Sequence, residues 1–249
     1  MPSERVYMDL AADISSWMAG RVAGAGVNGV VLGLSGGVDS AVSAFLAAKA
    51  LGGESVLAVN MPCGSDPADE ALASETARSA GVGYRIVGLD AAHAAMVAAC
   101  GLEGAPGMVK ANIKPRLRMT VLYAMSGGRL VVGSGNYSEH LVGYSTKWGD
   151  GACDIAPLAR LYKDEVYGLA RVLGVPGRVI DRPPTAGLWA GQTDEGEMGF
   201  TYLDLRRRFE GHAVDPAVAA RIDALGRAGA HKREPIPVFE AREWFATHG

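Results

Sequence analysis

The chain has 249 residues, of which 49% are hydrophobic and 20% are charged, and its formal net charge is -3. This composition excludes an intrinsically disordered chain, and the acidic balance argues against a protein that coats nucleic acid. The longest apolar runs are too short to cross a membrane, so no membrane association is expected. Three widely spaced cysteines without a CxxC pair indicate neither a disulfide framework nor a zinc site. Because the N-terminus lacks a signal-peptide pattern as well, a cytoplasmic location is expected.

The first predicted element is an amphipathic helix over residues 3–23, whose apolar face consists of Val6, Leu10, Ile14 and Trp17. Short apolar segments and helical patterns then alternate. Strands are expected at 29–34, 55–62, 84–90 and 129–135, and helices at 39–51, 67–80, 91–99 and 112–126. This alternation is typical of an α/β fold, a doubly wound, mostly parallel sheet of about five strands flanked by helices. Such sheets bind ligands at the carboxyl ends of their strands, near the point where the strand order reverses.

The last hundred residues have a different character. A helix that begins near Lys163 is ended by Gly174, and its apolar face is formed by Tyr162, Val166, Leu169 and Leu173. The segment 181–200 is rich in glycine, proline and acids and has no periodicity, so it is expected to be either disordered or a functional lid. We expect one domain over residues 1–249, with its core at about 29–240.

The sequence "SGGVDS", residues 35–40, joins the first predicted strand to the next helix. Two glycines let the backbone approach a phosphate, and the first N–H groups of the helix face the anion. The pattern is neither GxGxxG nor GxxxxGK[ST]. Asp39 would repel a polyphosphate unless a divalent cation lay between them, which makes it a candidate Mg²⁺ ligand. The alternative is a glycine turn in which Asp39 or Ser40 caps the helix.

This string resembles the SGGxDS loop of the ATP pyrophosphatase superfamily. A second stretch, residues 133–176 with "GSGNYSEH" and "GYSTKWGDGACD", resembles the signature of the ammonia-dependent NAD synthetase family. The sequences "NIKPRLRM" at 112–119, "PPTAGLWAGQTDEGEMGF" at 183–200 and "HKR" at 231–233 agree with it too. The resemblance implies a Rossmann-like fold of the adenine nucleotide alpha hydrolase type.

The resemblance also implies an activity. Members of this family amidate deamido-NAD with ammonia at the expense of ATP, through an NAD-adenylate, and release NAD, AMP and pyrophosphate in the last step of NAD biosynthesis. They are homodimers with the deamido-NAD site near the subunit interface, so the first helix and the helix at 107–126 are expected contact elements. Glutamine-dependent members carry an N-terminal nitrilase-like domain. Because the matched core begins near residue 29 here, no glutaminase domain is expected and free ammonia is the expected nitrogen donor, with a separate glutaminase subunit as the alternative.

Residue roles follow from the resemblance. For ATP it implies Gly33, Leu34, Ser35, Gly36, Gly37, Val38, Asp39, Ser40, Ser134, Lys163 and Thr185. For deamido-NAD it implies Asn112, Arg116, Lys147, Asp154, His231 and Lys232. Mg²⁺ is assigned to Asp39 and Glu139. The implied catalytic residues are Asp39, Lys163 and Asp150, the last of which would orient ammonia or its own loop.

The residues alone leave other interpretations open. Glu139 could be a first-turn acid that serves the helix dipole, Lys163 a solvated surface lysine, and the segment 147–154 a polar surface turn. Trp189 could cover a ligand. A different ATP pyrophosphatase would leave residues 133–176 unexplained. A nucleotide sensor without catalysis would be expected to have lost its charged ligands.

Overall fold

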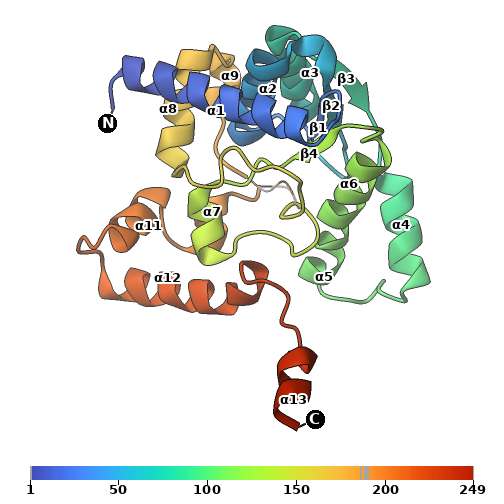
Figure 1. Cartoon of the computed structure of the whole chain (residues 1–249), viewed down its shortest axis with the longest axis vertical. Coiled ribbons are helices and arrows are strands. Elements are labelled where there is room, and N and C mark those ends of the chain that lie inside the picture. Colours follow the sequence, from blue (N-terminus) through green and yellow to red (C-terminus); the bar gives the residue numbers. More distant parts are fainter. Residues whose placement is uncertain (1, 186, 188–190, 249) are drawn as a thin grey trace.

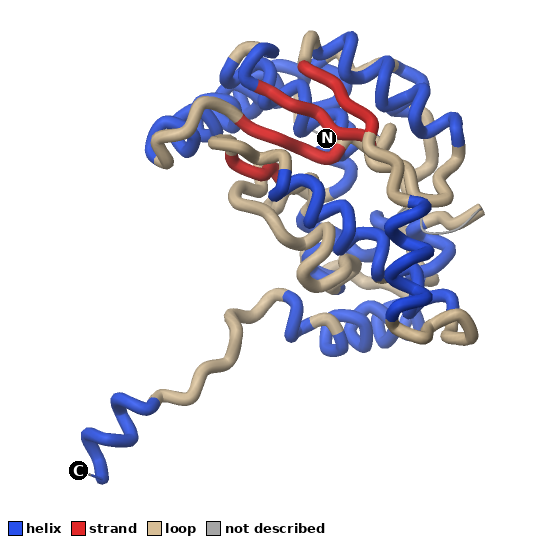
Figure 2. The backbone as a smooth tube through the Cα atoms, turned by 90° about the vertical axis from the view of Figure 1, so that its right-hand side faces the viewer, coloured by secondary structure: helices blue, strands red, loops and turns tan. Residues whose placement is uncertain are grey.

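The computed structural model describes residues 2–185, 187 and 191–248, so the predicted role of Trp189 lies outside the described residues. The sheet consists of four parallel strands in the order β3-β2-β1-β4 (Figure 2). They are β1 (Val30–Gly33), β2 (Val56–Asn60), β3 (Gly83–Ile86) and β4 (Leu130–Val132). β1, β2 and β4 lie within the predicted segments, whereas β3 begins one residue before the predicted segment 84–90 and ends at Ile86. The central strand β1 is buried almost completely, as expected for a sheet covered on both faces.

Helices cover both faces of the sheet (Figure 1). One face is packed by α1 (Glu4–Gly24), α2 (Val38–Leu51), α3 (Pro67–Ala80), α8 (Lys163–Leu173) and α9 (Gly177–Ile180). The opposite face is covered by α6 (Ile113–Ala124), against which α4 (Asp90–Ala99) and α5 (Gly107–Ala111) pack. The doubly wound α/β fold is therefore confirmed.

A smaller cluster of helices lies beyond the carboxyl edge of the sheet. It contains α7 (Tyr137–Val142), α10 (Asp194–Met198), α11 (Tyr202–Phe209) and α12 (Pro216–Ala228). Its own apolar core is formed by Val142, Met198, Phe200, Leu205 and Ile222. Two short 3-10 helices span Gly53–Ser55 and Ala230–Lys232. No helix in the described part of the chain is long and apolar enough to cross a membrane.

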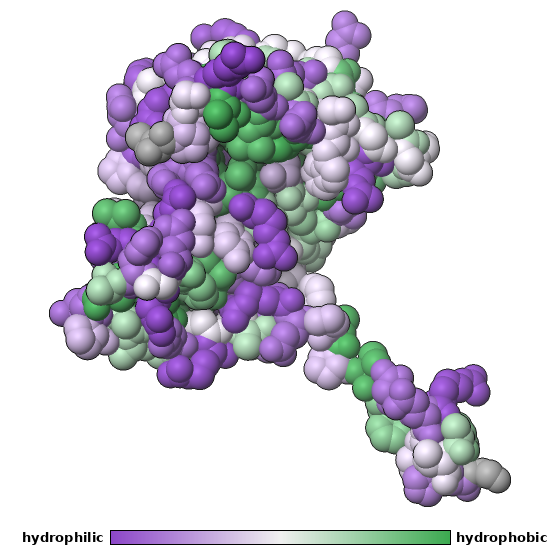
Figure 3. All heavy atoms as spheres, turned by 60° about the vertical axis from the view of Figure 1, so that its left-hand side comes forward, coloured by the Kyte–Doolittle hydropathy of each residue, from purple (hydrophilic) through white to green (hydrophobic). Residues whose placement is uncertain are grey.

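The C-terminal segment leaves the body of the molecule. Every residue from Glu234 to His248 is exposed, including those of α13 (Ala241–His248). The space-filling view shows this arm extending away from the rest of the protein, with apolar residues along it (Figure 3).

The fifth strand of the predicted sheet is absent from the described residues, which contribute only a single parallel bridge between Val132 and Ile155 at the outer edge of β4. The reason is visible in the hydrogen bonds. The edge-facing N–H of Val131 donates to Oδ2 of Asp154 at 2.7 Å, so a side chain occupies the position that a strand carbonyl would need. The chain then turns away after one bridge.

The structure also differs from the predictions for the first helix and for the segment 181–200. The buried face of α1 is formed by Tyr7, Ala11, Ser15, Met18 and Val22, whereas Val6 and Trp17 are exposed. Apolar residues lie on both sides of this helix, so their spacing alone does not select the inner face. The segment 181–200, expected to be either disordered or a functional lid, contains α10, whose N-cap Thr193 accepts a hydrogen bond from the N–H of Gly196, so disorder of the whole segment is wrong and the lid stays a prediction.

The strand order places the site. Reversal of the strand order occurs between β1 and β4, which are neighbours although β2 follows β1 in sequence. The loops that leave these two strands therefore begin side by side at the carboxyl edge, the usual ligand position in open α/β sheets.

Candidate active site at the carboxyl edge of the sheet

The loop after β1 is closed by Ser40. Its hydroxyl donates to the carbonyl of Gly37 at 2.9 Å and accepts the N–H of Ser35 at 3.2 Å. Gly36 has a φ of 83°, and a Cβ there would lie 2.5 Å from the carbonyl oxygen of Asp69, so glycine is required. No side chain among the described residues caps α2 at Gly37, which leaves its first N–H groups for an anion. The alternative of a capped glycine turn is therefore wrong.

Two carboxylates and one ammonium converge where the loops after β1 and β4 meet. Lys163 forms an ion pair with Oδ2 of Asp39, and its Nζ lies 3.7 Å from Oε1 of Glu139. Asn136 joins the two acids, because its amide donates to Oδ1 of Asp39 at 3.0 Å and its backbone N–H donates to Oε2 of Glu139 at 3.2 Å. The backbone N–H of Lys163 donates to Oγ of Ser138 at 3.1 Å and ties α8 to α7.

The position of Lys163 excludes one of the alternative interpretations. This residue is only 3% exposed, so it is not a solvated surface lysine. Glu139 does serve its helix as a capping-box acid, but its second carboxylate oxygen faces the ammonium. The role of Glu139 as a first-turn acid is therefore confirmed, and its role as a Mg²⁺ ligand stays a prediction.

Burial shapes the charges of this cluster. It raises the pKa of Glu139, the negative charge of Asp39 adds to this effect, and the ammonium of Lys163 opposes it. Burial also acts to lower the pKa of Lys163, but Asp39 and Glu139 outweigh it, so the pKa of Lys163 is raised and the ammonium stays charged. The side chains of Asp39 and Glu139 keep 16% and 20% of their surfaces accessible, which leaves them open to a ligand.

The loop after α7 gathers most of the residues predicted to contact the dinucleotide. Oγ1 of Thr146 donates to Oδ1 of Asn112 at 2.8 Å, which ties the loop to the start of α6. Nε of Arg116 donates to the carbonyl of Lys147 at 3.2 Å. Nζ of Lys147 in turn donates to the carbonyl of His231 at 2.6 Å, so three distant segments meet here.

Two further predicted residues belong to the same cluster. Nζ of Lys232 donates to the carbonyls of Gly143 and Ser145 at 2.7 and 2.6 Å. Asp150 accepts the N–H of Thr146 at 2.8 Å, and burial raises the pKa of Asp150 although one side of the residue remains open to solvent. The loop is thus a shaped structure with a basic rim and not a free polar turn.

Asp154 is the predicted dinucleotide contact that the structure does not bring into this cluster. Its Oδ1 accepts the O–H of Tyr123 at 3.0 Å and its Oδ2 accepts the N–H of Val131. Burial and the bond to Asp154 raise the pKa of Tyr123 to about 12. Asp154 therefore lies against the C-terminal half of α6 and the edge of β4.

The remaining predicted ATP contacts come from two places. Ser134 is the second residue after β4 and is half-buried at the sheet edge. Thr185 accepts the N–H of Gly187 at 3.1 Å. Arg182 forms an ion pair with Asp69, whose carbonyl lies against Gly36 in the loop after β1. The segment that carries Thr185 therefore begins beside that loop.

The sequence profile of the NAD synthase family matches residues 10–235. The chain belongs to the NAD synthase family. The NH(3)-dependent NAD(+) synthetase of Thermococcus kodakarensis is 46% identical, over 93% of this chain and 96% of the relative. The enzyme of that name from Syntrophomonas wolfei is 42% identical, over 90% and 93% of the two chains. The prediction of this family from the motifs is thus confirmed, and the interpretation as a different ATP pyrophosphatase is wrong.

Solved structures of NAD synthase relatives agree. The NMN synthetase from Francisella tularensis superposes with a TM-score of 0.90 at 34% identity and covers 96% of this chain and 100% of its own. The NH3-dependent NAD synthetase from Campylobacter jejuni, solved with a nitrate ion, gives 0.80 at 28% identity over 94% and 99% of the two chains. The glutamine-dependent enzyme from Acinetobacter baumannii gives 0.70 at 26% identity, and this chain covers 48% of its length.

In this NAD synthase, sequence reasoning missed some residues of the site. Asn136 holds Asp39 and caps α7, and the N-x-x-E spacing to Glu139 could have indicated it. Tyr202 at the start of α11 has its ring 5.3 Å from Nζ of Lys163, and it donates to Asp194, which comes from the aperiodic segment 181–200. No local signal could have placed them there.

Proposed function

We propose that the chain amidates deamido-NAD with ammonia and ATP, and produces NAD, AMP and pyrophosphate. The observation that carries this proposal is the meeting of Asp39, Glu139 and Lys163 at the end of a phosphate loop, beside a loop with a basic rim, in a chain of the NAD synthase family. The decisive experiment measures pyrophosphate release and NAD formation with Mg²⁺-ATP, deamido-NAD and ammonium. Failure to form either product would contradict the proposal.

ATP would bind with its phosphates against the loop after β1. The free N–H groups at the start of α2 and the positive end of its dipole favour an anion there. Lys163 supplies a buried positive charge beside this loop through its contact with Asp39. Charges that are already in place when the reaction begins lower the barrier because they need no reorganisation.

The pair of carboxylates fits Mg²⁺. Oxygens of Asp39 and Glu139 already share one cation, the ammonium of Lys163. In the described part of the chain no three His, Cys, Asp or Glu side chains form a ready cage. Mg²⁺ typically takes one or two carboxylates and completes its shell with phosphate oxygens and water, so Asp39 and Glu139 are the residues that would hold it. When bound, the ion neutralises phosphate charge and stabilises pyrophosphate as a leaving group.

The first chemical step joins the two substrates. An oxygen of the nicotinate carboxylate attacks the α-phosphorus of ATP, the bond from that phosphorus to the bridging oxygen breaks, and pyrophosphate leaves. The protein contributes by aligning the two substrates. The loop after α7, proposed for the dinucleotide, and the loop after β1, proposed for the phosphates, are held in place through α7 and α8. A positioned Lys163 would stabilise the charge that develops on the phosphates.

The second step forms the amide. Ammonia attacks the carbonyl carbon of the adenylate, the bond from that carbon to the phosphate oxygen breaks, AMP leaves and a proton is lost. Asp150 is the proposed residue that orients ammonia, because its carboxylate is fixed by the N–H of Thr146 and keeps a side open to solvent. Comparison of Asp150→Asn with wild type at saturating ATP tests this role: kcat should fall, whereas an unchanged kcat would contradict it.

Free ammonia is the proposed nitrogen donor. The relatives that this chain matches almost from end to end carry the name NH(3)-dependent NAD(+) synthetase. Assays with ammonium alone and with glutamine alone separate the two donors. Turnover that requires glutamine would contradict the proposal.

A second candidate product is NMN, since the superposition with a TM-score of 0.90 is on an NMN synthetase. The substrate would then be the carboxylate form of the mononucleotide. The higher identities of 42% and 46% to the two NAD(+) synthetases named above favour the dinucleotide. The ratio of kcat/KM for the two nicotinate nucleotides, measured side by side, decides between them.

A homodimer is also part of the proposal. Large apolar side chains are exposed on the two elements expected to form contacts, namely Val6, Met8 and Trp17 on α1, and Met108, Val109 and Tyr123 on α5 and α6. Such exposed side chains are typical of interfaces. Sedimentation equilibrium measures the state directly, and a mass of one chain at all concentrations would contradict a dimer.

A further inference from the structure

Asp194 is a buried acid to which the proposed function gives no role. It is 4% exposed and is the first residue of α10. Its Oδ2 accepts the O–H of Tyr202 at 2.8 Å, and its Oδ1 accepts the O–H of Tyr144 at 3.3 Å. Its backbone N–H donates to the carbonyl of Pro184 at 3.1 Å. Three separate segments therefore fix the position of this carboxylate.

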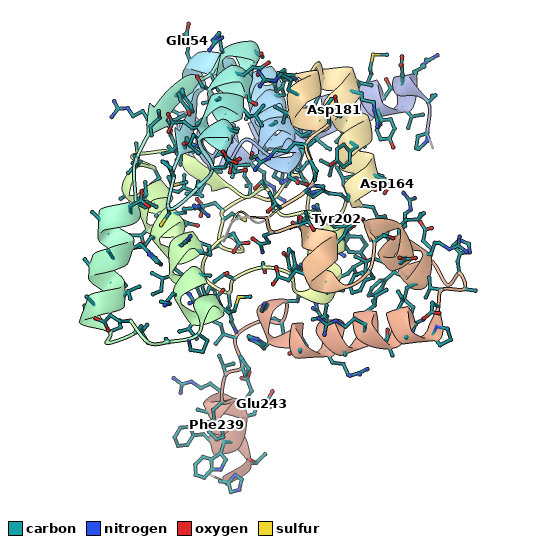
Figure 4. All side chains as sticks on the ribbon, turned by 180° about the vertical axis from the view of Figure 1, so that it is seen from behind. Glu54, Asp164, Asp181, Tyr202, Phe239 and Glu243 are labelled. Atoms are coloured by element: carbon teal, nitrogen blue, oxygen red, sulfur yellow. The ribbon has the colours of Figure 1, made fainter. Side chains whose placement is uncertain are left out.

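Tyr202 connects this acid to Lys163. Nζ of Lys163 lies 5.3 Å from the centroid of the Tyr202 ring, within the range of a cation–π interaction. Figure 4 shows Tyr202 at the start of α11, in the middle of the molecule. Burial, together with the charges of Glu139 and Asp194, raises the pKa of Tyr202, so its hydroxyl stays protonated and donates. The bond to Asp194 thus fixes the ring that faces the ammonium.

The present partners of Lys163 are the two acids proposed for Mg²⁺. A divalent cation on Asp39 and Glu139 takes up their oxygens and repels the ammonium, because like charges disfavour each other in a buried site. The ring of Tyr202 also lies beside Lys163 and is not part of that pair, and Asp194, which accepts the O–H of Tyr202, is near enough for the two charges to attract each other. They are therefore available to an ammonium that has lost its ion pair.

We propose that Tyr202 and Asp194 are positioning residues that hold the ammonium of Lys163 in the ATP site when Mg²⁺ occupies the carboxylates of Asp39 and Glu139. The inference rests on the proposed roles of those carboxylates. Tyr202 offers the face of its ring, and Asp194 offers a negative charge and fixes that ring. Lys163 then contacts the phosphates as a preorganised charge and not as a flexible one.

The test is the binding of α,β-methylene-ATP, which cannot be cleaved at the reacting bond, to the full chain by titration calorimetry with and without Mg²⁺. Three variants remove one part each: Tyr202→Leu removes the ring, Tyr202→Phe removes only the hydroxyl, and Asp194→Asn removes only the charge. The matched control is Tyr84→Phe, since the hydroxyl of Tyr84 on β3 is buried without a hydrogen-bond partner among the described residues.

Without Mg²⁺, all variants should bind the analogue as wild type does, within about twofold, because Lys163 is then held by Asp39 and Glu139. The gain in affinity that Mg²⁺ brings should be roughly tenfold smaller in Tyr202→Leu than in wild type, and roughly threefold smaller in Tyr202→Phe and in Asp194→Asn. The control should keep the full gain. If Tyr202→Leu does not fold, the two conservative variants carry the test.

Two results would overturn the inference. One is an undiminished gain with Mg²⁺ in Tyr202→Phe and Asp194→Asn. The other is an equal loss of affinity with and without Mg²⁺, which would indicate a merely structural role. These measurements use no second substrate, so they are separate from the proposed function. A wild type that gains affinity with Mg²⁺ but forms no amide would contradict the function and leave the binding comparison decisive for Lys163.

Discussion

Replacement of Asp39 by asparagine isolates the charge at the centre of the site. The side chains of Asp39 and Lys163 are only 16% and 4% exposed. Loss of one partner from a buried ion pair costs about 3–5 kcal/mol, because the other charge is left uncompensated. Glu139 remains 3.7 Å from the ammonium and offsets part of this, so we expect a loss of about 2–4 kcal/mol.

The hydrogen bonds point in the same direction. Asp39 accepts from two donors, the ammonium of Lys163 and the amide of Asn136. The NH₂ group of an asparagine must face one of these donors, and an unsatisfied buried donor costs about 1–3 kcal/mol, which lies within the range above. For a chain of this length, 1 kcal/mol corresponds to about 2–4 °C in Tm, so Tm should fall by roughly 5–15 °C.

The assays are urea denaturation and pyrophosphate release with Mg²⁺-ATP, deamido-NAD and ammonium. Turnover of Asp39→Asn should fall by about 10²–10³, the usual cost of losing one preorganised electrostatic contact. Glu54→Gln, at an exposed position far from the site in Figure 4, is the control and should change neither quantity. The double variant Asp39→Asn/Lys163→Met should recover about 1–2 kcal/mol relative to Asp39→Asn. Turnover within threefold of wild type would refute the role of the charge, and unchanged stability would refute the buried ion pair.

Three further predictions concern other parts of the chain. Arg116→Ala should raise the KM for deamido-NAD about 10–100-fold and leave the KM for ATP unchanged, because charge-assisted contacts of a guanidinium contribute about 1.5–3 kcal/mol; an equal rise in both would contradict this. Gly29→Ala should destabilise the protein by about 3 kcal/mol or more, since the new Cβ would lie 2.0 Å from the carbonyl oxygen of Ser55. Gly20→Ala, with open space around it in α1, should stabilise the protein by about 0.5–1 kcal/mol. Denaturation curves measure both changes. Burial raises the pKa of the Cys153 thiol, which leaves less reactive thiolate at any given pH. Iodoacetamide at pH 8 should therefore label the exposed Cys100 before Cys153. Equal labelling rates of the two cysteines, followed by mass spectrometry, would contradict this.

The sheet was predictable because its signals are local. Each buried strand is a short apolar run with a turn at its end, and the loop "SGGVDS" marks where the first strand ends. The helix α8 was predictable too, since its apolar residues recur at helical spacing between Lys163 and Gly174. In these elements one segment carries enough information to specify its own structure.

The predictions were wrong where a contact between residues far apart in sequence determines the local structure. The inner face of α1 depends on α2 and α8, against which Tyr7 and Ala11 pack, and the helix alone carries apolar residues on both sides. The missing fifth strand depends on a single side chain, Asp154, that bonds the edge of β4. Neither effect leaves a periodic signal in the sequence.

The same argument applies to the site. The motifs placed Asp39 and Glu139 at neighbouring strand ends, and this was predictable from the parallel topology. The resemblance implied only that Lys163 contacts ATP; its burial between the two acids was not predicted, because Asp39 and Lys163 are 124 positions apart. Asp194 lies in the stretch 183–200 that resembles the family, but no role was predicted for it.

The charges in this centre support the proposal that a divalent cation binds there. Burial raises the pKa values of Glu139 and Asp194, so ionisation of both together with Asp39 would leave two negative charges that the single ammonium of Lys163 does not compensate. One Mg²⁺ supplies that charge, while its preference for phosphate oxygens and water leaves most of its shell to ATP and solvent. Two carboxylates alone hold such an ion weakly. If the proposed Mg²⁺ binds here, it should arrive with the nucleotide, because repulsion among these acids would favour the binding of Mg²⁺ and ATP together over the binding of either alone.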